Sequence, residues 1–324
     1  MKILKRALSA TPLVWPFRPN GLYVFNYHRI GDSALSDFDP NVFSCTSARF
    51  ENQLVFFKNS FTVISEDELL TIFDSEKTYN DKFALITFDD GYIDNYELAY
   101  PLLLKHKLPA SFFIATDFIL NNVIPWWDEI AFIIKACNPN HIKLTSIKEE
   151  FNLTNVPIDY KIKEVLRQFK QSKKPSMDEK IAELRDALGY YDKIETNQPL
   201  FMNWQQMLEM KANGMTFGSQ TCSHSILSHL SNEQQEFEIK NSKLKLETKL
   251  NTTISSIAYP VGTIDSYNQT TLKLTKHYGY KIGFSFISGI NQTANNQFEF
   301  RRLPVGNNVS ISQLKQQINR IILG

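Results

Sequence analysis

The sequence contains little cysteine and little glycine. Only three cysteines occur in 324 residues, at Cys45, Cys137 and Cys222. Their odd number and wide spacing argue against a disulfide framework and against a structural zinc ribbon. Reduced cysteines are typical of the cytoplasm, so we expect a cytoplasmic protein. Because there are only 12 glycines and neither a GxGxxG motif nor a P-loop, a nucleotide-binding α/β fold is disfavoured.

The sequence also lacks an excess of either charge. Lys and Arg number 35 and Asp and Glu number 34, which gives a net charge of +1 and argues against nucleic acid as a partner. No run of about 18 apolar residues occurs, so we expect no transmembrane helix. The first 20 residues are basic but are interrupted by Thr11, Pro12 and Pro16. We expect no signal peptide there, but a separate segment that packs on the protein or makes peripheral contact with a membrane.

Short apolar runs alternate with amphipathic stretches over most of residues 21–324. Continuous apolar strands that alternate with helices are typical of a parallel sheet covered on both faces, and seven or eight such units favour a barrel. The expected strands are Gly21–His28, Phe61–Ser65, Phe83–Asp89, Ala110–Ala115, Met215–Ser219, Ser256–Pro260, Lys281–Ser288 and Phe298–Val305.

Residues 118–200 interrupt this alternation. The stretch contains PWWDEIAFIIKA, KIKEVLRQFKQSKK and DEKIAELRDALGYYD, which predict helices with a charged face and no strand. No Gly/Ser/Pro-rich linker isolates it, so we expect a helical insertion in the barrel domain rather than an independent domain.

Polar residues follow several of the expected strands, and functional residues of β/α barrels lie at the carboxyl ends of strands. Asp89 and Asp90 are the strongest pair, because two adjacent carboxylates after an apolar strand repel each other unless they have partners. A bound cation would take one carboxylate as a ligand and leave the other as a base. A strand-to-helix turn with an Asp N-cap is the structural alternative.

Histidines follow two other expected strands. His224, with His229 five residues later, follows the strand at residues 215–219, and His28 ends the first strand. A carboxylate and an imidazole suit zinc or another first-row divalent ion. A single histidine is more often structural, so each of these residues is also compatible with a purely structural role.

Together these segments resemble the polysaccharide deacetylase, or NodB-homology, family. TFDDGY at residues 87–92 is similar to the family's first motif, and GSQTCSH at 218–224 is similar to its second, metal-binding motif. AYPVG at 258–262 resembles the variant third motif of members from exopolysaccharide loci. NYHRIG at 26–31, PWWD at 125–128 and FRRLPV at 300–305 also resemble that subgroup. The similarity extends from about residue 22 to 320 and implies a distorted (β/α)7 barrel with a helical insertion.

The resemblance assigns roles to individual residues. It makes Asp89 the general base, Asp90 and His224 metal ligands, and the Tyr259 backbone N–H a donor to the oxyanion. The implied cofactor is a divalent metal, zinc first, with cobalt, nickel or manganese as alternatives. The implied reaction removes N-acetyl, or alternatively O-acetyl, groups from a polysaccharide, an oligosaccharide or a glycan precursor.

The sequence departs from the family pattern at two places. Gln220 stands where the second motif has its first histidine, and an amide oxygen is a weaker ligand for zinc than an imidazole. Either the metal is held less tightly, or His229 or His28 substitutes, or hydrolysis is lost. The late histidine that acts as general acid is also missing, and His28 is the candidate replacement. Arg301 or Arg302 could orient Asp89 or bind substrate, although neighbours on a strand face opposite ways.

Two other functions remain as alternatives. A degenerate, sugar-binding member of the same fold is suggested by Gln220. A glycoside hydrolase is disfavoured, because adjacent Asp89 and Asp90 cannot flank a glycosidic bond as two carboxylates ~5 to 9 Å apart would.

Overall fold

A computed structural model describes residues 9, 13–75, 79–121, 123–196, 198–293 and 296–323. The chain divides into two compact units. Unit 1 comprises Met1–Gly31, Ser44–Asn121 and Phe201–Gly324, and unit 2 comprises Asp32–Phe43 and Asn122–Leu200. Most of the expected N-terminal segment, residues 1–20, lies outside the described residues, so its packing and its contact with a membrane stay predictions.

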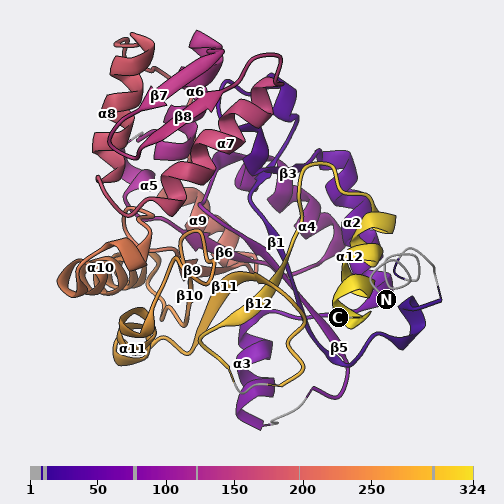
Figure 1. Ribbon diagram of the computed structural model, residues 1–324. Coiled ribbons are helices and arrows are strands. Elements are labelled where there is room, and N and C mark those ends of the chain that lie inside the picture. Colours follow the sequence, from indigo (N-terminus) through magenta and orange to yellow (C-terminus); the bar gives the residue numbers. More distant parts are fainter. Residues whose placement is uncertain are drawn as a thin grey trace. The chain divides into compact units, whose positions relative to one another are not determined.

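Unit 1 is a closed barrel of parallel strands (Figure 1). Strand β1 pairs with β12 on one side and with β5 on the other, and this second pairing closes the ring. In their order around the ring, the strands are β1 (Gly21–Tyr27), β5 (Lys82–Phe88), β6 (Ser111–Ile114), β9 (Thr216–Ser219), β10 (Ser256–Ala258), β11 (Ile282–Ser288) and β12 (Phe300–Pro304). The predicted (β/α)7 barrel is therefore confirmed.

Each expected strand is present, and one of them lies outside the ring. Strand β4 (Thr62–Val63) is only two residues long and pairs with the first half of β5, whereas β6 pairs with the last residues of β5. The strand expected at residues 61–65 is therefore an addition to the sheet rather than one of the seven strands of the closed barrel.

Side chains alternate between two apolar layers along the strands, as the period of two requires. On β1, Leu22 and Val24 belong to the apolar cluster inside the barrel, whereas Tyr23 and Phe25 belong to the larger cluster between the barrel and its helices. On β9, Gly218 makes the barrel close tightly, because a Cβ there would lie 2.5 Å from the ring of Phe113. Apolar side chains therefore fill both layers, and polar side chains on the inward face of a strand are exceptions to this pattern.

Helices cover the outside of the barrel. The long helix α10 packs against α11 (Figure 1). The helices of unit 1 are α2 (Ser47–Ser60), α3 (Glu66–Ser75), α4 (Tyr100–His106), α5 (Phe118–Asn121), α9 (Trp204–Ala212), α10 (Asn232–Leu250), α11 (Gln269–His277) and α12 (Ile311–Leu323). Its short helical segments are η1 (Trp15–Phe17), η4 (Asn95–Ala99) and η5 (Leu227–His229).

The described residues of unit 2 form three α-helices, as predicted, and one strand pair that the sequence analysis missed. Strands β7 (His141–Leu144) and β8 (Glu149–Asn152) pair antiparallel. They are only four residues long and expose every second side chain of β7, a pattern too short to separate from a loop. The other elements here are η2 (Ser33–Leu35), η3 (Pro40–Val42), α6 (Trp126–Cys137), α7 (Ile158–Gln171) and α8 (Met177–Leu188). The short strands β2 (Arg29–Ile30) and β3 (Phe43–Cys45) flank the first segment of this unit in the sequence.

No helix formed by the described residues has the length and apolar content needed to cross a bilayer.

A buried carboxyl group lies at the amino ends of the strands. Glu66, the first residue of α3, is buried and accepts a hydrogen bond of 2.8 Å from the Ser256 hydroxyl at the start of β10. Burial raises the pKa of Glu66 from an ordinary 4.5 to about 7, although hydrogen bonds from Ser256 and Ser111 oppose the shift. The folded protein therefore binds this proton more tightly than the unfolded chain does.

This shift predicts a specific loss of stability with rising pH. The contribution of protonated Glu66 is complete below pH 4.5 and is lost as the pH rises through about 7. We expect the free energy of unfolding to fall by about 3 kcal/mol more in wild type than in Glu66→Gln between pH 4 and pH 8. Urea denaturation at both pH values measures it. Asp67 is an exposed carboxylate in the same helical turn, so Asp67→Asn should behave like wild type. If the free energy of unfolding falls equally with pH in Glu66→Gln and in wild type, the assignment is contradicted.

Candidate active site

The alternation inside the barrel brings polar side chains together at the carboxyl ends of β1, β5 and β12. Asn26 is two residues beyond Val24, Thr87 and then Asp89 follow Leu85, and Arg302 is two residues beyond Phe300. Each of these polar residues is buried. Because Asn26 pairs with Thr87 in the register of β1 and β5, the polar layer continues the apolar one towards the rim.

Asp89 is held by two partners from other strands. Arg302 donates from Nη1 to Asp89 Oδ1 at 2.8 Å, and Asn26 donates from Nδ2 to Oδ2 at 3.2 Å. The same Arg302 nitrogen donates to Asn26 Oδ1 at 2.6 Å, and Arg302 Nε donates to the Ser285 carbonyl oxygen at 2.7 Å. A buried carboxylate requires such a cation and hydrogen bonds, because desolvation disfavours its charge. The prediction that Arg302 orients Asp89 agrees with this geometry.

His28 lies beside the same carboxylate. Its Nε2 is 3.8 Å from Asp89 Oδ2, and its side chain is 25% exposed. The ring packs edge-on against Phe286 at a centroid distance of 5.8 Å. Asn95 fixes the backbone here, because its Nδ2 donates to the His28 carbonyl oxygen at 2.7 Å. His28 therefore lies next to Asp89 with part of its ring exposed at the rim.

Asp90 and His224 form a second pair next to the first. His224 Nε2 lies 3.3 Å from Asp90 Oδ1, and both side chains are almost completely buried. Both residues adopt left-handed backbone conformations, with φ of 75° at Asp90 and 56° at His224. Such values are uncommon outside glycine, and they turn each side chain back towards the other after its strand has ended.

Helix α10 anchors the loop that carries His224. Glu238 Oε2 accepts hydrogen bonds from the N–H groups of Cys222 and Ser223 at 2.8 and 2.9 Å, and Glu238 Oε1 accepts one from the Ser223 hydroxyl at 2.6 Å. Helix α10 begins at Asn232 because Ser231 and Gln234 form a reciprocal capping box in front of it. His224 is thus positioned by a helix as well as by β9.

The side-chain oxygen of Gln220 is bonded to the backbone next to this pair. Its Oε1 accepts a hydrogen bond of 2.6 Å from the backbone N–H of Asp90. Gln220 is buried, and its own N–H continues the barrel ladder to the Ile114 carbonyl oxygen at 2.9 Å. The side chain therefore joins the turn after β5 to the end of β9.

The structure corrects the prediction for Tyr259. The Tyr259 N–H donates to the Phe284 carbonyl oxygen at 3.0 Å within the barrel ladder, and its ring stacks on Tyr267. It is therefore not directed at a substrate. Pro260 has no N–H, so the first backbone donor beyond the ladder is that of Val261. Val261 has a φ of 62°, which is rare for a β-branched residue and marks a strained turn at the rim.

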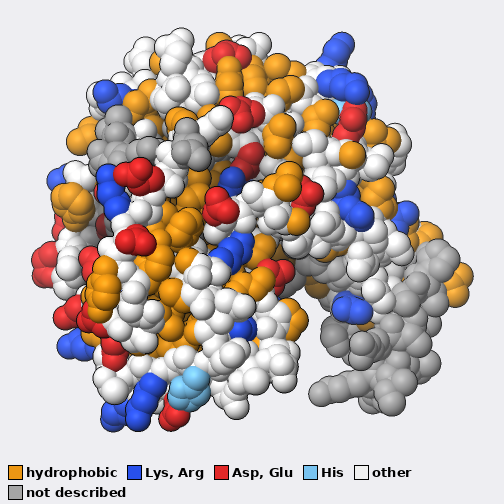
Figure 2. Space-filling view, turned by 90° about the horizontal axis from the view of Figure 1, so that it is seen from above, with side chains coloured by type: hydrophobic (Ala, Val, Ile, Leu, Met, Phe, Trp, Pro, Cys, Tyr) orange, Lys and Arg blue, Asp and Glu red, His pale blue; other side chains and the backbone are white. Residues whose placement is uncertain are grey.

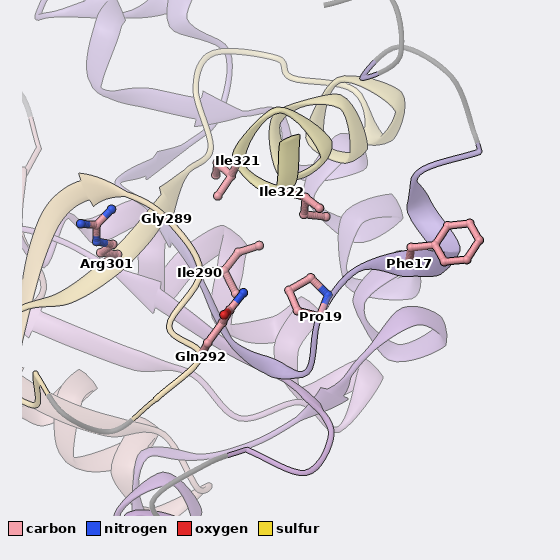
Figure 3. Close-up of a pocket in the computed structure, with 8 residues that line it drawn as sticks. All are labelled: Phe17, Pro19, Gly289, Ile290, Gln292, Arg301, Ile321 and Ile322. Carbon is pink, nitrogen blue, oxygen red and sulfur yellow. The ribbon is translucent and has the colours of Figure 1, made fainter. Parts of the chain in front are cut away.

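Arg301 faces the opposite way from Arg302. Arg301 is exposed and, with Ile290 and Ile322, lines a pocket of about 380 Å³ on unit 1 (Figure 3). This pocket contains none of the polar side chains around Asp89 and Asp90. Of the two arginines, only Arg302 takes part in the site.

Three residues that organise the site were missed in the sequence analysis. Asn26, Asn95 and Glu238 each hold a predicted residue or its loop. Asn26 could have been found, because it shares the inward face of its strand with Val24. Glu238 could not, because only the tertiary packing of α10 brings it to the loop.

Comparison with known proteins agrees with this arrangement. The profile of the polysaccharide deacetylase family matches residues 76–283, which include both aspartates, Gln220 and His224. The chain belongs to the polysaccharide deacetylase family. This membership places the deacetylase among hydrolases that act on carbon–nitrogen bonds other than peptide bonds.

Individual relatives extend the comparison. The protein YxkH of Bacillus subtilis, whose name assigns it to the polysaccharide deacetylases, is 22% identical over 90% of this chain and 74% of its own length. A poly-β-1,6-N-acetyl-D-glucosamine N-deacetylase of Staphylococcus aureus is 25% identical over 34% of this chain and 41% of its own length.

Solved structures share the fold. The Streptococcus pyogenes deacetylase PplD in complex with acetate has a TM-score of 0.60 and 23% identity, covering 93% of this chain and 99% of that one. IcaB from Ammonifex degensii has a TM-score of 0.58 and 16% identity, covering 93% and 97%. At these identities the likeness establishes the barrel fold and nothing further.

Deacetylases of this type are generally metal-dependent, and the residues of this deacetylase fit a divalent ion with two ligands. The carboxylate of Asp90 and the imidazole of His224 converge and have the right chemistry. Within the described ranges, no group of three His, Cys, Asp or Glu residues is close enough to hold an ion. The prediction that His229 or His28 completes the ligand set stays a prediction. So does the prediction of Gln220 as a ligand, although its Oε1 accepts a hydrogen bond from the Asp90 N–H in this structure.

The ion pair between Arg302 and Asp89, called the clamp below, predicts different effects for substitutions of Arg302 and of its neighbour Arg301. Arg302→Ala leaves a buried carboxylate without its cation and should lower the free energy of unfolding by about 3–5 kcal/mol. Arg302→Lys should lie between that variant and wild type, because lysine keeps the charge but not the fork of donors. Arg301→Ala is the matched control and should stay within about 0.5 kcal/mol of wild type. Urea denaturation measures each value; similar losses at both positions would refute the clamp.

Proposed function

We propose that this deacetylase hydrolyses N-acetyl groups of an N-acetylated carbohydrate, releasing acetate and a free amino sugar. The observation that carries the proposal is the meeting of two pairs at one rim of the barrel. His28 and Asp89 form the first pair, at 3.8 Å, and Asp90 and His224 form the second, at 3.3 Å. The first pair can move protons and the second can hold a cation, and amide hydrolysis requires both activities.

The first pair supplies the proton transfers. Water attacks the acetyl carbonyl carbon while Asp89 accepts one of its protons. His28, in its protonated form, donates a proton to the leaving nitrogen as the carbon–nitrogen bond breaks. Asp89 then returns its proton to His28, which restores both groups. Arg302 and Asn26 keep the Asp89 carboxylate in one orientation throughout.

The second pair would hold the ion. Asp90 and His224 would hold a divalent ion, which would supply Lewis-acid polarisation of the carbonyl group and a lower pKa of water. Zinc is the first candidate, because its ligands in proteins include carboxylate and imidazole. In place of Tyr259, we assign the backbone donor for the oxyanion to Val261, because its N–H is the first one beyond the ladder.

The substrate class is inferred from relatives and from surface charge. The Staphylococcus aureus relative is named for poly-β-1,6-N-acetyl-D-glucosamine, which makes β-1,6-linked N-acetylglucosamine oligomers the first substrates to test. The net charge of the chain is +1, and acidic and basic side chains are interspersed on the face seen in Figure 2, so charge does not point to a polyanionic substrate. A cytoplasmic location, which we keep as part of the proposal, would suit a soluble or lipid-linked precursor.

A sugar-binding protein without hydrolytic activity is the second candidate. Gln220 favours it, because the amide replaces the imidazole that the family pattern has at this position. The two candidates differ in a direct assay: the hydrolase releases acetate from N-acetylglucosamine oligomers when zinc or cobalt is supplied, and the binding protein does not.

Asp89→Asn tests the proposed base. Neutralising the carboxylate should lower the rate of acetate release on the order of 10² to 10⁴-fold, because a positioned acid or base contributes that factor. Sugar affinity, measured by calorimetry, should change little, and Asp67→Asn should keep full activity. Released reducing ends, counted in the same samples, should stay at background. Wild type that binds the oligomer but releases no acetate would refute the hydrolase and favour the binding protein.

His28→Gln tests the proposed acid. The amide keeps size and polarity but cannot transfer a proton, so kcat should fall on the order of 100-fold while KM changes little. The limb of the pH–rate profile that reports protonation of His28 should disappear. His277→Gln on α11 is the exposed histidine control. If both variants keep the wild-type pH profile, His28 is not the acid.

A further inference from the structure

The hydrogen bond from the Asp90 N–H to Gln220 joins the two loops that carry the cation-binding pair. Gln220 directly follows β9, four residues before His224, and Asp90 follows β5. The donor–acceptor distance is 2.6 Å, and both residues are buried. Gln220 therefore contacts the backbone of one ligand residue, not its carboxylate.

The backbone of Asp90 explains why an acceptor is needed there. Its φ of 75° and the φ of 83° at Gly91 turn the chain away from the barrel ladder directly after β5. A buried N–H in such a turn is costly unless it has an acceptor. The amide oxygen of Gln220 supplies one, and it does so without any ion.

We propose that Gln220 is a latch for the Asp90 turn rather than a metal ligand. Of the residues that the structure describes, Asp90 and His224 would then bind a divalent ion without Gln220, weakly and exchangeably. The proposal rests on the proposed function only in placing the ion at this pair. Its consequence is a protein that keeps its site geometry without metal and loses the ion readily on dilution or chelation.

The opposite possibility is that Gln220 releases the N–H and turns its oxygen to the ion. The two possibilities differ in what removal of the amide does. Gln220→Ala removes a latch in the first case and a ligand in the second. A latch stabilises the metal-free fold, whereas a ligand contributes only when the ion is present.

Zinc binding to the full-length protein separates them. The probe is Zn²⁺ alone, titrated against a chelating dye, with Co²⁺ absorption as a second readout. Gln220→Ala should keep zinc affinity within about threefold of wild type and lower the metal-free Tm by about 2–4 °C. His224→Ala should abolish binding. Gln220→His adds a second imidazole as a third ligand and should tighten binding by ~100-fold, about the increment per ligand that the zinc affinity of four-ligand sites implies.

Three outcomes would overturn the proposal. Gln220→Ala could lose as much zinc affinity as His224→Ala, wild type could bind as tightly as Gln220→His, or Gln220→Ala could leave the metal-free Tm unchanged. The comparison of wild type, Gln220→Ala and His224→Ala decides the question even if Gln220→His fails to fold. The double variant with Gln220→His and His224→Ala should lose the gained affinity, which shows that the new imidazole acts at this site.

Acetate release is measured separately, so that failure of the latch and failure of the proposed function remain distinguishable. The expected zinc pattern without acetate release would refute the hydrolase and leave the latch in place. Acetate release by wild type, together with equal zinc losses in Gln220→Ala and His224→Ala, would refute the latch alone.

Discussion

The ion pair between Arg302 and Asp89 depends on closure of the barrel. The two residues are 213 positions apart in the sequence, and they meet because β12 and β5 pair with opposite sides of β1. Asn26, on β1 between them, bonds to both. A carboxylate buried this deeply is unfavourable without its cation, so the last strand must be in place before Asp89 has a stable environment. The environment of Asp89 therefore depends on β12, the strand that completes the barrel.

The two halves of the site differ in how they are held. Asp89 and Arg302 are fixed by neighbouring strands, whereas Asp90 and His224 lie on turns with left-handed residues. Those turns depend on side chains from elsewhere, Glu238 for the His224 loop and Gln220 for the Asp90 turn. Strand-borne groups keep one geometry, and loop-borne groups can adjust by small backbone changes. In the proposed reaction the carbonyl changes from planar to tetrahedral, and a rigid pair for proton transfer beside an adjustable pair for the cation would suit that change.

The sequence predicted the barrel well because its strands carry continuous apolar runs and its polar residues cluster after them. It also predicted that Asp89, Asp90, His224 and His28 would meet, since carboxyl ends of parallel strands share one rim. It failed where backbone geometry decides the outcome. The pattern around Tyr259 does not reveal that the barrel ladder consumes its N–H, and β7 and β8 are too short to leave a periodic signal. The sequence showed that Gln220 departs from the family pattern. It could not show that Gln220 bonds to a backbone N–H, because every residue except proline has one.

Charge balance explains why the fold does not depend on an ion at the proposed cation site, where Gln220 replaces the histidine of the family pattern. The negative charge of Asp89 is compensated by Arg302, so the inner half of the site is stable whether or not an ion is bound. The backbone of Asp90 is held by Gln220, and its carboxylate faces the His224 imidazole. An imidazole at position 220 would add affinity for zinc but would not by itself satisfy the Asp90 N–H while bound to the ion. Under the latch proposal, the Gln220 amide lowers the affinity for metal but keeps the Asp90 turn ordered when no metal is bound. The proposed proton transfers at Asp89 and His28 do not depend on tight metal binding.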